Sequence, residues 1–133
     1  MAVVAGALLG MVINGGIVSV SGMFIPPPSG VDPNDLESIK ANMHLFEAKH
    51  FVMPFLAHAI GTFVGALLTA MLAASRKLTF ALVIGLFFLL GGIAASLMIP
   101  APLWFGISDL LIAYIPMAFL GGKLGQRLVP AKQ

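Results

Sequence analysis

The chain has 133 residues, of which 59% are hydrophobic and only 9% are charged, and its net charge is +2. Its mean hydropathy is +1.05. Soluble domains carry roughly 45–50% apolar and about 25% charged residues, so this composition excludes an ordinary soluble domain and indicates an integral membrane protein. The chain contains no cysteine, which excludes disulfides and thiolate chemistry within it. Its basic residues border apolar stretches and form no cluster, so no nucleic-acid partner is expected.

Four stretches are apolar and long enough to cross a bilayer, which takes about 20 residues. They cover roughly residues 2–24, 52–74, 79–99 and 103–122. The first lacks the basic start of a secretory signal, so we expect it to be retained as a span. The last three spans are joined by short connections, and these force neighbouring helices to run antiparallel. We therefore predict one all-α domain over residues 1–133, an integral membrane four-helix antiparallel bundle in a lipid bilayer.

The segment between the first two spans is predicted to form an amphipathic helix over roughly residues 33–50. Asp32 and Pro33 have the pattern of an N-cap followed by a proline in the first turn. After them, five residues recur at helical spacing and form one stripe along the predicted helix. It consists of Leu36, Ile39, Met43, Phe46 and His50. We expect this helix to lie on the outer membrane interface or to cap the bundle.

Positive charges follow the second and the fourth span. They are Arg76 and Lys77, then Lys123, Arg127 and Lys132. In a four-span protein both sets fall on one side of the membrane, and the positive-inside rule makes that side the cytoplasm. Both termini are therefore predicted to be cytoplasmic.

Small residues recur every four positions in three of the spans. They are Gly6 and Gly10 in the first, Ala57, Gly61 and Gly65 in the second, and Gly121 and Gly125 at the end of the fourth. This spacing lets helix backbones approach closely. It predicts tight packing within the chain or in a homo-oligomer, and it does not choose between the two.

Asp109 lies inside the apolar fourth span, where a carboxylate costs a few kcal/mol or more and needs a partner. His58 and Asp109 each lie six residues into their spans, which places both about 9 Å below the outer boundary at about 1.5 Å of rise per residue. We predict that they form an intramembrane polar pair, with Ser96 as a possible third member. The pair is either a proton relay or metal site, since histidine titrates near neutrality, or a hydrogen bond that joins two helices.

A kink is expected in the fourth span at Pro116, because proline leaves the carbonyl of Ile112 without its helical donor. Tyr114 lies beside this position. A kinked helix with a buried acid above the kink is one way to build a gate or a binding site.

A second candidate metal motif is Glu47 with His50, which have the Glu-x-x-His spacing of di-iron carboxylate proteins. Together with His58 and Asp109 they make up the candidate metal ligands. A di-iron site needs further glutamates, and a haem needs histidines on opposite sides, which a dimer could supply through two copies of His58. No cofactor is expected. The chain has no P-loop, nucleophile elbow or zincin motif, and we predict that it is not an enzyme.

Three stretches carry a resemblance to a known family. They are IPPPSGVD at residues 25–32, LFEAKHF at 45–51 and PFLAHAIGT at 54–62. With them the chain resembles a family of small four-span bacterial inner-membrane proteins. The resemblance implies a location in the bacterial inner (cytoplasmic) membrane and no particular activity.

Two functions fit these patterns. The leading hypothesis is a non-enzymatic structural or accessory membrane subunit, either homo-oligomeric or part of a larger complex with other membrane subunits. The alternative is a small transporter, channel or metal-binding membrane protein that works through the pair of His58 and Asp109.

Overall fold

The computed structural model describes residues 1–130, and these form helices and the turns between them. Within this part, four helical stretches are long and apolar enough to cross a membrane. They are α1 (Ala2–Phe24), α3 (Val52–Leu72), α4 (Lys77–Met98), and the consecutive helices α5 (Leu103–Ile112) and α6 (Ile115–Leu128). The predicted all-helical class and its four long apolar helices are confirmed. Lys132, one of the basic residues behind the predicted topology, lies outside the described residues.

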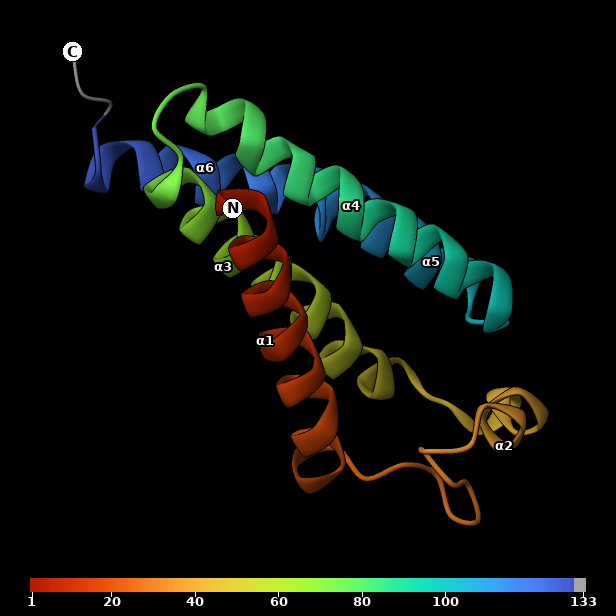
Figure 1. Cartoon of the computed structure of the whole chain (residues 1–133). Coiled ribbons are helices and arrows are strands. Elements are labelled where there is room, and N and C mark those ends of the chain that lie inside the picture. The colour runs from red at the N-terminus through yellow and green to blue at the C-terminus, as the bar shows by residue number, and fades with distance from the viewer. Residues whose placement is uncertain (131–133) are drawn as a thin grey trace.

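Helix α3 is the centre of the molecule, since α1, α4 and α6 all pack against it. Figure 1 shows α1 beside α3 and α4 beside α5 and α6. The first group, α1 and α3, lies close to the second group, α4, α5 and α6, near the start of α1 and the end of α6. The two groups diverge toward the end of the molecule near α2 (Figure 1). The space described below as a cleft lies between these diverging groups.

The contact between α1 and α3 is made by glycines. A Cβ atom on Gly65 would lie 2.7 Å from the carbonyl oxygen of Gly6, and one on Gly61 would lie 2.8 Å from that of Gly10. Ala57, the third small residue of the α3 series, is fully buried. Such close backbone approach maximises dispersion contacts, which are a main source of helix association where no hydrophobic drive acts between helices.

The opposite side of α3 receives α6 in the same way. A Cβ atom on Gly125 would lie 2.7 Å from the Cβ atom of Ala70, and Gly121 lies against the backbone at Phe63. The small residues of three helices are therefore used in contacts within one chain, and α3 is flanked closely on two sides.

The fourth span is interrupted rather than only kinked. Helix α5 ends at Ile112, α6 begins at Ile115, and Pro116 occupies the first turn of α6. Proline is tolerated there because first-turn N–H groups have no helical acceptor. The predicted deformation at Pro116 is thus present. Helix α6 continues past residue 122, the predicted end of the span, to Leu128, and Arg127 lies in its last turn, where a cation is favourable.

The single helix predicted over residues 33–50 is wrong. The segment forms three short pieces, namely α2 (Leu36–Ala41), η1 (Met43–Leu45) and η2 (Ala48–Phe51). The side-chain amide of Asn42 donates to the carbonyl oxygen of Ser38 at 2.8 Å. Such local bonds from side chain to backbone compete with continuation of a helix, and periodicity does not register them.

The predicted N-cap is also displaced. The Asp35 carboxylate accepts the backbone N–H of Glu37 and caps α2. Asp32 instead accepts the N–H of Asn34 at 2.9 Å, in a turn that precedes the helix. Pro33 therefore lies before α2 and not in its first turn.

Lys77 has a role that its position beside a span did not reveal. Its side chain is buried, and its ammonium group donates to the carbonyl oxygens of Ala70, at 2.9 Å, and of Ala73. The last carbonyl groups of a helix have no helical donors, so this cation satisfies the end of α3.

We expect Gly6→Ala to lower the free energy of unfolding by about 1–3 kcal/mol, because the added methyl group would overlap the Thr69 hydroxyl and the Gly65 carbonyl. Gly16→Ala is the matched control in the same helix, since nothing lies within 4 Å of a Cβ atom there. Unfolding in mixed micelles with increasing SDS measures both. Equal effects of the two variants would show that α1 does not pack on α3 through Gly6.

Replacing Lys77 with methionine should destabilise the protein by about 1–3 kcal/mol, since it leaves buried carbonyl groups at the end of α3 without a donor. Arg76→Met removes the same charge from the neighbouring exposed side chain and should change the midpoint of the SDS unfolding transition little. The same SDS titration distinguishes the two. If Arg76→Met is as harmful as Lys77→Met, the effect comes from charge and not from the cap.

Candidate functional site

Asp109 of α5 is buried, and its carboxylate faces His58 of α3. The Nδ1 atom of His58 lies 2.9 Å from each of the two carboxylate oxygens. With Asp109 ionised, this geometry requires a proton on Nδ1, which donates to the carboxylate. The structure therefore places His58 and Asp109 in contact, as predicted from their equal depth in the two spans.

Tyr114 completes a network of three side chains. Its hydroxyl donates to the Oδ2 atom of Asp109 at 2.9 Å, and its ring stacks on that of His58 with 5.7 Å between centroids. The interruption of the fourth span puts Tyr114 at the N-cap of α6, five residues after Asp109. Ser96 does not join this network, because its hydroxyl donates to the carbonyl of Ile93 in its own helix.

A glycine on α4 makes room for the tyrosine. A Cβ atom on Gly92 would lie 2.6 Å from the Cζ atom of Tyr114. Any larger residue would push the ring away from Asp109, so Gly92 positions the network without a polar group of its own. The sequence offered no signal for this, since Gly92 belonged to none of the predicted small-residue series.

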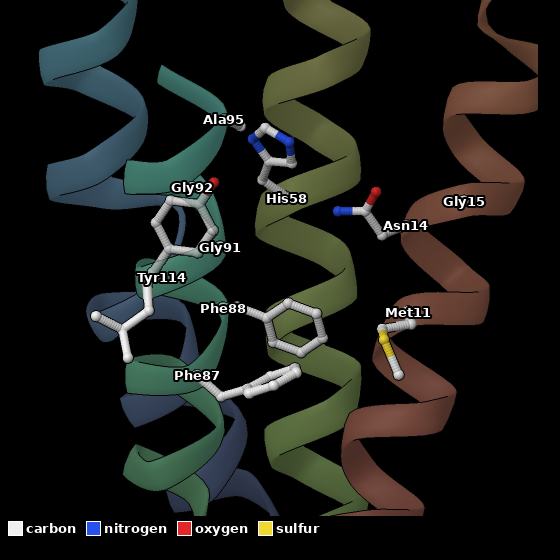
Figure 2. A pocket seen from close by; sticks show the side chains of 11 residues that line it. Met11, Asn14, Gly15, His58, Phe87, Phe88, Gly91, Gly92, Ala95 and Tyr114 are labelled. Carbon is white, nitrogen blue, oxygen red and sulfur yellow. The ribbon is translucent and has the colours of Figure 1, made fainter. Parts of the chain in front are cut away.

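The network borders a cleft of about 570 Å³ that α1, α3 and α4 form between them. His58 and Tyr114 line it from one side, and Asn14 lines it from α1. Figure 2 shows the Asn14 side chain reaching from α1 toward α3, next to His58. The rest of the wall is mainly apolar or glycine. It includes Met11, Gly15, Phe87, Phe88, Gly91 and Gly92.

One ring nitrogen of His58 is not used in the network. Its Nδ1 atom is engaged with Asp109, and no hydrogen-bond partner of Nε2 exists among residues 1–130. About a quarter of the side chain, 24%, is accessible. Figure 2 shows the second nitrogen turned toward the α1 side of the cleft. The network thus presents one oriented imidazole nitrogen to an apolar space.

The four candidate metal ligands do not form one site. Glu47 and His50 lie in the turn at η2, where the His50 Nδ1 atom accepts the backbone N–H of Glu47 at 2.8 Å. His58 and Asp109 pair with each other elsewhere. In the described part of the chain no three side chains of the metal-binding types lie together. The Glu-x-x-His spacing serves here as a local cap of a 3₁₀ turn and not as one face of an α-helix.

Comparison of the chain with protein-family models, with curated proteins and with solved structures finds no match. The resemblance to small bacterial inner-membrane proteins therefore stays a prediction. The function has to be argued from the geometry of the site.

We expect Tyr114→Phe to lower the free energy of unfolding by about 1–3 kcal/mol, because it removes a donor from a buried carboxylate. Ser108→Ala is the control, since it removes an exposed hydroxyl that bonds only within α5. SDS titration of both variants provides the measurement. A Tyr114→Phe protein as stable as the control would mean that His58 alone satisfies Asp109.

Proposed function

We propose that this chain is a four-span membrane protein that binds a small molecule in the cleft beside His58. The observation that carries the proposal is the free Nε2 atom of an imidazole held in place by Asp109 and facing a cleft. The chemistry belongs to the class of small transporters, channels and binding proteins that use an intramembrane ionisable pair.

The arrangement of these side chains supports a role beyond that of a hydrogen bond that joins two helices. The hydrogen bond between α3 and α5 is complete at Nδ1 of His58, and Tyr114 gives the Asp109 carboxylate a second donor, so Nε2 is not needed to hold the helices together. Two donors fix the carboxylate, and the carboxylate fixes the tautomer and the direction of the imidazole. The fixed orientation turns Nε2 toward the cleft, where a ligand can contact it.

The membrane setting belongs to the same proposal. The four spans cross the bilayer as an antiparallel bundle, in keeping with the glycine pairs Gly6–Gly65 and Gly10–Gly61, whose numbers run in opposite order. The basic residues that follow α3 and α6 face the cytoplasm under the positive-inside rule. The resemblance to inner-membrane proteins supports the bacterial cytoplasmic membrane as the location. The site then lies in the outer half of the bilayer.

The accessory-subunit hypothesis remains a prediction with less support. It rests on the small-residue series, the scarcity of polar groups and the absence of catalytic motifs, and of the small residues, Gly6, Gly10, Gly61 and Gly65 are used between α1 and α3 of one chain. The exposed apolar side chains of the four spans are what a lipid-facing surface requires in any case.

The test is native mass spectrometry of the protein extracted from its own membrane in a mild detergent. We expect the wild type to carry a small-molecule mass and His58→Gln to lose it, because glutamine can still donate to Asp109 but has no imidazole nitrogen for the ligand. His44→Gln removes a histidine from an exposed position between α2 and α3 and should keep the mass.

Two results would contradict the proposal. One is a wild-type protein with no bound small molecule, and the other is a mass that both histidine variants retain. Additional protein chains or a defined homo-oligomer in place of a ligand would favour the accessory-subunit hypothesis.

A further inference from the structure

We propose that the ligand is an uncharged, lipid-soluble ring that carries oxygen substituents, of the quinone and hydroquinone class, and that it enters the cleft sideways from the bilayer. This inference rests on the proposed function and adds the chemical class of the ligand and its route. It is argued from the shape of the cleft, its lack of charge and its two polar groups.

The cleft opens between α1 and α4. Helix α1 packs mainly on α3 and touches α4 much less. Gly15 of α1 and Gly91 of α4 both line the cleft, and nothing lies within 4 Å of a Cβ atom built on either. Phe88 closes one end, since its ring lies against Gly10. In a bilayer the open side between α1 and α4 faces lipid, so a molecule dissolved in the membrane reaches the cleft without crossing a polar surface.

The wall suits an uncharged molecule. Among the described residues that line the cleft there is no lysine, arginine, aspartate or glutamate, His58 is the single group that can become positively charged, and the Asp109 carboxylate lies behind it. A phosphate headgroup would find no lysine or arginine there, and a hydrated cation would find no exposed carboxylate. Burial of an unpaired charge at this depth is too costly for either to be the natural ligand.

Two polar groups that line the cleft remain for the ligand, one on α3 and one on α1. They are the Nε2 atom of His58 and the side-chain amide of Asn14, which has no hydrogen-bond partner among residues 1–130. Asn14 lies near the middle of α1, where an amide facing apolar surroundings is unfavourable. When His58 is neutral, its Nε2 atom accepts a hydrogen bond from a hydroxyl group, and when His58 is protonated, Nε2 donates one to a carbonyl oxygen. The Asn14 amide can donate or accept a hydrogen bond.

A ring with two oxygen substituents can contact both polar groups, whereas a fatty alcohol or an acyl chain uses one at most. Phe87 and Phe88 offer apolar aromatic surface on α4 for such a ring (Figure 2). The volume of about 570 Å³ lies within the range of about 300–1,000 Å³ typical of small-molecule sites. An apolar tail would leave through the opening between α1 and α4 into lipid.

The experiment titrates the purified full-length chain in detergent with a decyl-substituted benzoquinone and with its hydroquinone, and counts the bound fraction by native mass spectrometry. Decylcyclohexane, which has the tail and a ring but no oxygen, is the control probe. We expect saturable binding of the oxygenated rings and none of decylcyclohexane. Asn14→Leu should weaken binding about tenfold, the value of one hydrogen bond of about 1.4 kcal/mol.

The control variant is Asn34→Leu, which removes an exposed amide from the turn before α2 and should bind as the wild type does. Equal binding of decylcyclohexane, or equal binding by Asn14→Leu and wild type, would overturn the assignment of the ligand. If the oxygenated rings fail to bind while a native small molecule stays bound through His58, the ligand class is wrong and the proposed function stands. If neither is found, both fail.

Discussion

A carboxylate inside an apolar helix must be hydrogen-bonded, and Asp109 meets this requirement with donors from two different parts of the chain. His58 reaches it from α3, and Tyr114 reaches it because the fourth span is interrupted between α5 and α6. Gly92 on α4 leaves the space that the tyrosine ring needs. The hydrogen bonds of one acid therefore depend on three features of the fold, namely the break in the fourth span, the contact between α3 and α5, and a glycine on α4.

Packing at the opposite end of the molecule explains why there is a cleft at all. Gly6 and Gly125 let α1 and α6 approach α3 closely where the helices gather. Gly15 and Gly16, the next glycines of α1 after Gly10, have open space around them. Figure 1 shows α1 and α3 diverging from α4 and α5 toward the end of the molecule near α2. Close contact at one end and separation at the other leave a space at the level of the buried network.

The long apolar helices were predictable because lipid demands both length and composition, and the pairing of His58 with Asp109 was predictable from helix rise alone. The segment after α1 was not, because Asn42 forms a local bond to the backbone of Ser38 that periodicity does not contain. The Glu-x-x-His spacing of Glu47 and His50 did not reveal that the two residues cap a 3₁₀ turn, because spacing along a chain does not show where a helix is interrupted. The hydrogen bond from Tyr114 to Asp109 depends on the interruption of the helix at Pro116. A proline in a span predicts a kink, but it does not predict how far the helix is interrupted.

The chain keeps two polar groups, the imidazole of His58 and the amide of Asn14, beside an apolar cleft in a molecule that has few polar side chains within its spans. If the network served only to join helices, a leucine at residue 14 would pack better against lipid, and His58 would need no accessible nitrogen. Asp109 and Tyr114 are enclosed, whereas these two groups are not. Stability therefore accounts for the enclosed half of the network, and the proposed binding is what would account for the half that faces the cleft. The boundary between the two runs through the His58 ring, in which Nδ1 contacts Asp109 and Nε2 is the atom proposed to contact a ligand.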